Sequence, residues 1–146
     1  MSSTKSEGHK SSFEEVLAQD GELFFTNEGY SMLPFIHPKQ DILHIKKLDG
    51  ELELGDVILY SDKPHHYVLH RLIKIRKDGH FISAGDNNYW KDRPIKRECV
   101  LGKLIDVTYP NGKTIYLEEN KKEARKMAKS YWKRAISLRI KRLFKR

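Results

Sequence analysis

Short stretches in which apolar and polar residues alternate follow one another through most of the chain, between positions 22 and 118. Such alternation buries one face of a strand, and β-branched and aromatic residues favour the extended backbone. The pattern predicts strands over residues 23–26, 41–46, 56–60, 67–75, 81–84 and 100–107. Pro110-Asn111-Gly112 separates the last strand from a further apolar run at 114–117 and predicts a hairpin turn. Because no helical stretches alternate with these strands, the expected fold is a compact, mainly β, antiparallel domain.

Two segments with helical spacing bound this β region. Ser12 and Glu15 have the spacing of a capping box, which predicts a short helix over about 13–19 that ends before Gly21. From about Glu118 onwards, apolar residues recur every three or four positions among Lys and Arg, which predicts a basic amphipathic helix of about 25 residues. The apolar residues form two neighbouring stripes, one with Ala124, Met127, Ala128, Tyr131, Ala135 and Leu138, the other with Trp132, Ile136, Ile140, Leu143 and Phe144.

These patterns divide the chain into three parts. Residues 1–11 are polar and expected to be disordered, residues 12–118 form the β domain, and residues 119–146 form the helical tail. A single cysteine, Cys99, excludes an internal disulfide bond. Since the sequence has no secretory leader and no run of about 18 apolar residues, the expected location is the cytoplasm.

The net charge of +8 is unevenly distributed along the 146 residues. Residues 121–146 carry 12 Lys and Arg and one acid, a net charge of +11, whereas residues 1–120 carry 16 basic and 19 acidic residues, a net charge of −3. For the tail we consider packing on the β domain, binding to the anionic inner face of a membrane, and binding to an acidic partner or a nucleic acid. The slightly acidic body and the lack of a recognisable nucleic-acid motif disfavour a nucleic-acid function.

The first candidate for chemistry is Ser31, in the segment Glu28-Gly29-Tyr30-Ser31-Met32-Leu33-Pro34. Gly29 permits unusual backbone angles and Pro34 stiffens the chain after the serine. A serine held in this way can present its hydroxyl and its backbone N–H to a substrate carbonyl. The alternative is an ordinary serine in a turn.

The second candidate is His70, which strand alternation places on the same face as Val68 and Leu72. A serine hydroxyl needs an adjacent base to act as a nucleophile at neutral pH, and a neutral imidazole can be that base. The alternative is a half-buried histidine bonded to a backbone carbonyl. His65-His66 has no carboxylate or thiol at metal-ligand spacing, so we expect neither a metal nor another cofactor.

The third candidate is the polar segment from Ser83 to Pro94, which contains Asp86 and Asp92. Gly, Asp and Asn in series are typical of a loop. A functional interpretation places both carboxylates beside the strand that carries His70-Arg71.

Four motifs follow one another in order: Gly29-x-Ser31-Met32-x-Pro34, Leu54-Gly55-Asp56-Val57-Ile58-x-Tyr60, His70-Arg71, and Gly85-Asp86-Asn87-Asn88 with Asp92. Over about residues 23–107 the chain resembles the type I signal peptidases and, more distantly, the self-cleaving repressors of the same clan. The resemblance implies a mainly β catalytic domain whose serine attacks the scissile carbonyl. Most bacterial members have a lysine before the arginine. This chain has His70 there and so resembles the endoplasmic-reticulum and sporulation-type branch, which uses Ser–His chemistry.

The resemblance implies a role for each matching residue. Ser31 resembles the nucleophile, whose backbone N–H would also bind the oxyanion. His70 resembles the general base, and Asp92 the aspartate that orients this histidine. Asp86 resembles the residue that pairs with the arginine, here Arg71.

Met32 and Pro34 are expected to shape the substrate groove and the turn at the nucleophile. The chain departs from the family at Gly29, where members often have a serine that assists the oxyanion hole. We also expect neither their membrane anchor nor their inserted second β domain, since only about 15 residues separate His70 from Asp86. The expected function is that of a serine endopeptidase that hydrolyses a peptide or precursor protein through an acyl-enzyme. The alternatives are a catalytically silent peptide-binding module of the same fold and nucleic-acid binding through the tail.

Overall fold

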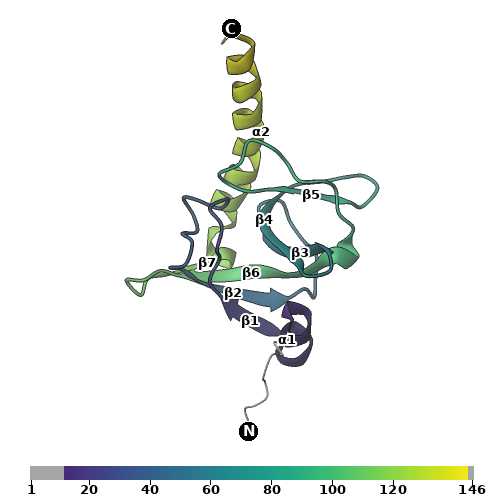
Figure 1. Cartoon of the computed structure of the whole chain (residues 1–146), viewed down its shortest axis with the longest axis vertical. Coiled ribbons are helices and arrows are strands. Elements are labelled where there is room, and N and C mark those ends of the chain that lie inside the picture. The colour runs from purple at the N-terminus through teal and green to yellow at the C-terminus, as the bar shows by residue number, and fades with distance from the viewer. Residues whose placement is uncertain (1–11, 145–146) are drawn as a thin grey trace.

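The computed structural model describes residues 12–144, so the expectation for residues 1–11 lies outside the described residues. Within this range seven strands form one sheet in which all neighbouring strands are antiparallel. The strands are β1 (Glu22–Phe25), β2 (Ile42–Lys47), β3 (Val57–Lys63), β4 (His66–Ile75), β5 (Phe81–Ala84), β6 (Val100–Thr108) and β7 (Thr114–Tyr116). The predicted antiparallel β domain with a short N-terminal helix and a long C-terminal helix is confirmed (Figure 1).

The order of the strands in the sheet is β1-β2-β6-β3-β4-β5, with β7 paired to β6 across the predicted hairpin turn. β6 therefore lies between two strands that come much earlier in the chain. Register shifts interrupt four of the pairings, and such irregularities increase the local twist of a sheet. The largest difference from the predicted bounds is in β3, which continues to Lys63 because it pairs with β4 up to His66.

The short helix α1 (Phe13–Asp20) begins at the predicted capping box. The Ser12 hydroxyl accepts a hydrogen bond from the Glu15 N–H, and the Glu15 carboxylate accepts one from the Ser12 N–H. The helix ends at Gly21, which has a left-handed backbone conformation with φ of 76°. Leu17 of α1 is buried in the core with residues of β2, β3 and β6.

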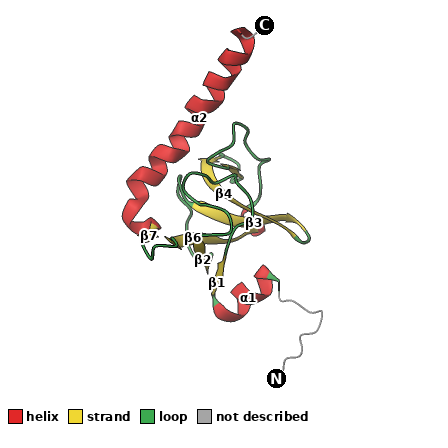
Figure 2. Ribbon diagram, turned by 60° about the vertical axis from the view of Figure 1, so that its left-hand side comes forward, coloured by secondary structure: helices red, strands yellow, loops and turns green. Residues whose placement is uncertain are grey.

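The long helix α2 (Lys121–Phe144) follows two short 3₁₀ turns, η2 (Arg97–Cys99) and η3 (Leu117–Asn120), that flank β6 and β7. The part of α2 up to Ala135 packs on the sheet, where Ala128, Tyr131 and Ala135 are buried against β4 and β5. Gly55 allows a close approach, since a Cβ there would lie 2.7 Å from the Ala124 backbone. The rest of the helix projects beyond the domain (Figures 1 and 2). None of the helices within residues 12–144 has the length and apolar character needed to cross a membrane.

Candidate active site

Ser31 lies in the turn region that follows β1, on a loop whose neighbouring side chains are anchored in the core. Met32 and Ile36 are completely buried, and the Ile36 N–H donates a hydrogen bond to the Met32 carbonyl at 2.9 Å. The peptide bond between Leu33 and Pro34 is cis. Because these contacts hold the loop from behind, the half-buried Ser31 is kept at its surface.

The segment after β5 packs directly against the Ser31 loop. A Cβ at position 85 would lie 2.6 Å from the Ser31 carbonyl oxygen and 2.9 Å from Ser31 Cβ, so only a glycine fits there without moving the serine. The Asn87 N–H donates to the Ser31 carbonyl at 2.8 Å, and its side-chain amide donates to the Tyr30 carbonyl at 3.3 Å. The sequence indicated a polar loop here, whereas the close approach of Gly85 depends on the tertiary fold.

The structure brings Ser31, His70 and Asp92 into one chain of hydrogen bonds. His70 Nε2 lies 2.9 Å from Ser31 Oγ, and His70 Nδ1 lies 2.6 Å from Asp92 Oδ2. An ionised carboxylate can only accept hydrogen bonds, so the imidazole proton belongs on Nδ1. Nε2 is then the acceptor for the serine proton, which is the arrangement a general base requires.

Asp92 is held by two further donors that the sequence analysis did not assign. The Tyr60 hydroxyl lies 3.0 Å and the Ser83 hydroxyl 2.8 Å from Asp92 Oδ2, and the Asp92 N–H donates to the Ser83 carbonyl at 2.8 Å. Burial, reinforced by the Asp92 charge, raises the pKa of Tyr60, so this phenol remains a neutral donor. Strands β3 and β4 pair so that Ile58 lies opposite His70. Tyr60 comes two residues after Ile58, so its side chain lies on the same face of the sheet as His70. Knowledge of this pairing would have identified Tyr60 as a neighbour of the site.

Arg71 follows His70 and therefore points to the opposite face of β4. Its Nε atom lies 2.8 Å from Asp86 Oδ1, and its Nη2 atom lies 2.8 Å from Asp86 Oδ2. Nη1 donates to the Gly55 carbonyl at 2.9 Å. The two side chains are buried, with exposed fractions of 4% and 3%. The pair ties the segment after β5 to β4. Asp86 contacts Arg71 on one face of β4, and Asp92 contacts His70 on the other.

The middle of α2 also contacts this segment. The Tyr131 hydroxyl donates to the Tyr89 carbonyl at 3.4 Å, and Arg134 Nη2 donates to the Asn88 carbonyl at 3.3 Å. The sequence pattern predicted no role for the helix in the site, because nothing in a local pattern indicates which surface a terminal helix covers. The middle of the helix supports the segment that carries Asp92.

A cleft of about 420 Å³ opens beside Ser31 and His70. Apolar side chains of α1, β1, β3 and β4 form most of its wall, and Gly29 lies at its edge. From Arg71 onwards β4 pairs with β5, but among the described residues its first half, from His66 to His70, pairs only with β3. The cleft is therefore bordered by a strand edge with free hydrogen-bonding groups.

Met32 and Pro34 differ from what the sequence analysis expected, because neither lines this cleft. The turn directs Met32 into the core, where its sulfur accepts a hydrogen bond from the Asp86 N–H at 3.5 Å. Pro34 borders a separate apolar cavity of about 350 Å³ between the loop and α2. The two residues shape the turn at Ser31 and leave the groove to other side chains.

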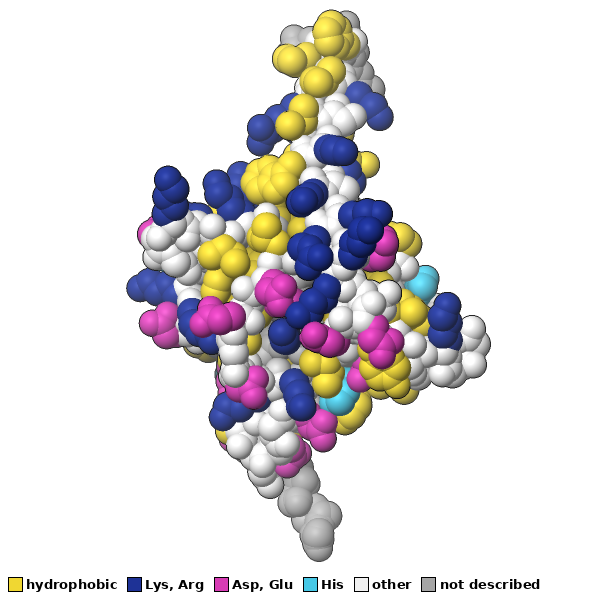
Figure 3. All heavy atoms as spheres, turned by 180° about the vertical axis from the view of Figure 1, so that it is seen from behind, with side chains coloured by type: hydrophobic (Ala, Val, Ile, Leu, Met, Phe, Trp, Pro, Cys, Tyr) yellow, Lys and Arg dark blue, Asp and Glu magenta, His cyan; other side chains and the backbone are white. Residues whose placement is uncertain are grey.

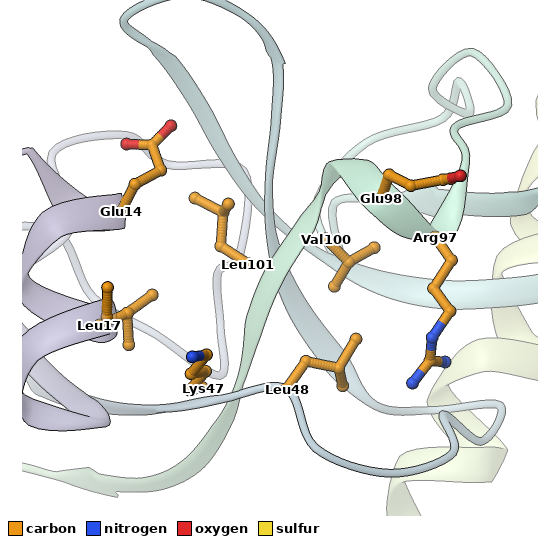
Figure 4. A pocket seen from close by; sticks show the side chains of 9 residues that line it. Glu14, Leu17, Lys47, Leu48, Arg97, Glu98, Val100 and Leu101 are labelled. Carbon is orange, nitrogen blue, oxygen red and sulfur yellow. The ribbon is translucent and has the colours of Figure 1, made fainter.

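Further hollows lie elsewhere on the surface. One of about 870 Å³ adjoins the other side of His70 and is lined by Tyr60, Asp92 and Arg93 among others. Another, of about 510 Å³, lies between α1 and the start of β6 and contains none of the candidate residues (Figure 4). Among residues 12–144, no three His, Cys, Asp or Glu side chains meet in a way that could hold a metal ion.

Comparisons with known proteins identify no relative of the chain. No protein-family model matches the chain, and no curated protein or solved structure matches it. The interpretation of the site therefore depends on its geometry and on the ordered motifs of the sequence.

Proposed function

We propose that the protein is a serine endopeptidase in which Ser31 is the nucleophile, His70 the general base and Asp92 the residue that orients the base. The observation that carries the proposal is the continuous contact from Ser31 Oγ through both imidazole nitrogens to Asp92, at 2.9 and 2.6 Å. These residues are separated by 39 and 22 positions in the chain, so chance proximity in sequence does not explain their contact. The proposal includes a catalytic fold of the signal-peptidase type, which the order of the motifs supports.

The proposed reaction follows from the direction of these hydrogen bonds. As Ser31 Oγ attacks the scissile carbonyl carbon, its proton moves to His70 Nε2. Asp92 accepts the Nδ1–H and stabilises the imidazolium that forms. His70 then donates the proton to the leaving amine, and a water molecule deprotonated by the same nitrogen hydrolyses the acyl-enzyme.

The developing negative charge on the carbonyl oxygen needs a donor, and the Ser31 N–H is available for it. This N–H has no hydrogen-bond acceptor within residues 12–144. At position 29 a Cβ would meet no atom within 4 Å, so there is space for the oxyanion or for a side chain that assists it.

The proposed substrate is an extended peptide or a segment of a precursor protein. The edge of β4 that has no strand partner within residues 12–144 can add such a segment as a further strand, with main-chain hydrogen bonds for affinity and the apolar cleft for side chains. Strand addition holds the main chain of the substrate and so positions its scissile carbonyl without requiring one particular side chain.

A fluorophosphonate probe tests the proposal, because it phosphonylates only a serine that a base has activated. We expect one adduct, located on Ser31 by mass spectrometry of the digested protein. Ser31→Ala should give no adduct and His70→Ala a strongly reduced rate, whereas Ser61→Ala, which removes a hydroxyl bonded to the Lys63 carbonyl on β3, should react normally. Labelling that persists in Ser31→Ala would contradict the proposed nucleophile.

A catalytically silent peptide-binding module is the second candidate, because the free strand edge and the cleft would bind a peptide without any chemistry. The same experiment separates the two functions. A silent module binds extended peptides but gives no adduct in the unmodified protein, whereas the peptidase gives both results.

A further inference from the structure

Helix α2 has two apolar faces, and beyond Trp132, which packs beside the first face, the second face is left exposed. The first face is buried on the sheet through Ala128, Tyr131 and Ala135. The second lies at the projecting end, where Ile136, Ile140, Leu143 and Phe144 have exposed fractions of 55%, 49%, 76% and 83%. At 3.6 residues per turn, the second face is rotated by about 130° from the first. It therefore cannot pack on the β domain while the first face does.

The projecting end is also strongly basic. Between Ile136 and Phe144 it carries Arg139, Lys141 and Arg142 and no acidic residue. The described carboxylates that pair with α2 lie at its start, where Lys121 contacts Glu53 and Glu118 and Lys126 contacts Glu123. Hydrophobic and basic side chains consequently gather on the end of α2 that stands clear of the domain (Figure 3).

We propose that residues 136–144 form a docking surface for an anionic lipid membrane. The apolar face would enter the boundary between headgroups and acyl chains, while the basic residues on either side of it bind lipid phosphates. Because this end projects beyond the sheet, binding requires no rearrangement of the β domain (Figure 2).

Two other partners explain these residues less well. Nucleic acid would use the basic side chains but would leave four aligned apolar ones in water. A second copy of the chain would cover the apolar face but would place the two sets of Arg139, Lys141 and Arg142 together, with no acid in this segment to pair with them. An anionic membrane satisfies both the apolar and the basic side chains.

Flotation of the full chain with vesicles tests the proposal. We expect binding to vesicles of phosphatidylcholine with about one third phosphatidylglycerol, little binding to phosphatidylcholine alone, and release as the salt concentration rises. Leu143→Ser combined with Phe144→Ser should weaken binding at least about tenfold. Ser31→Ala should bind like the unmodified protein, since docking is independent of the proposed catalysis.

A pair of charge variants separates local docking from a general effect of net charge. Lys141→Gln with Arg142→Gln and Lys122→Gln with Arg125→Gln each remove two positive charges from exposed positions of α2. The first pair should weaken vesicle binding clearly more than the second. All variants should keep the melting temperature of the unmodified protein, since these side chains are exposed.

Any of the following results would overturn the proposal. The first is equal binding to neutral and anionic vesicles, and equal effects of the two charge variants would count in the same way. The second is binding to duplex DNA or RNA without binding to anionic vesicles. The third is a dimer in sedimentation that Leu143→Ser with Phe144→Ser dissociates, because a second copy would then cover this face.

Discussion

Two histidines in the same sheet, His70 and His44, have nearly the same surroundings but a different second partner. Their side chains have exposed fractions of 12% and 15%, and Nδ1 of each contacts a carboxylate, Asp92 at 2.6 Å and Asp106 at 2.8 Å. Nε2 of His70 then meets the Ser31 hydroxyl, whereas Nε2 of His44 meets a second carboxylate, Glu22, at 2.7 Å.

This difference decides what each histidine can do. A hydroxyl can donate to Nε2, so a neutral imidazole satisfies both of its partners at His70. Nε2 of His44 instead faces a carboxylate, which has no hydroxyl proton for this nitrogen to accept. His44 joins β1, β2 and β6, and its ring stacks on Phe24 with the centroids 4.2 Å apart. Burial and one carboxylate contact are therefore common to both histidines, and the two differ in the partner of the second nitrogen, which is a hydroxyl at His70 and a carboxylate at His44.

The largest expected effect comes from replacing each histidine in turn. His70→Ala should slow hydrolysis of a peptide library, and labelling by the fluorophosphonate, by about 10,000-fold, because Ser31 loses its base. His44→Ala should leave the rate per folded molecule close to that of the unmodified protein and lower the free energy of unfolding by about 1–3 kcal/mol. Comparable losses of activity in the two variants would break the comparison.

The carboxylates give the next largest effect. Asp92→Asn should reduce the rate by about 100-fold or more, because an amide can donate to Nδ1 and favour the wrong tautomer of His70. Asp106→Asn should change the rate little. Rates that the two variants lower equally would contradict the assigned roles.

Asp86→Ala tests how the Asp92 segment is held against β4. Removing one partner leaves Arg71 charged and buried, so the free energy of unfolding should fall by about 3–5 kcal/mol, and activity should fall with it. Asp78→Ala is the matched control, because the Arg76–Asp78 pair is exposed and should contribute less than about 1 kcal/mol. Thermal unfolding of both variants measures the difference. Equal melting temperatures would show that the buried pair contributes no more to stability than the exposed pair.

Tyr60→Phe is expected to have the smallest effect and a distinct pH signature. Losing the hydrogen bond to Asp92 should cost about 1 kcal/mol at neutral pH. The raised pKa of Tyr60 keeps its proton on the folded chain above about pH 10, where the unfolded chain loses it, so this residue makes stability fall with rising pH. The variant should show a shallower alkaline decline in denaturant titrations, and an unchanged decline would argue against this origin.

Much of the secondary structure could be predicted because its causes are local. The capping box of α1 is formed by residues three apart, and the turn at Pro110-Asn111-Gly112 is set by residues with the right backbone preferences. Alternation alone places His70 and Arg71 on opposite faces of one strand. The ordered motifs also named Ser31, His70 and Asp92 as candidates, but a motif does not show that its residues touch.

Contacts between distant segments were decided only by the tertiary structure. Strand pairing and register depend on burial summed over the whole sheet, so the sequence did not reveal that β6 lies between β2 and β3, or that Tyr60 and Ser83 converge on Asp92. The same limit applies to α2. Its sequence determined two apolar stripes and a basic helix. Only the position of the sheet decided that the first stripe is buried together with Trp132, whereas the rest of the second stripe remains exposed at the projecting end.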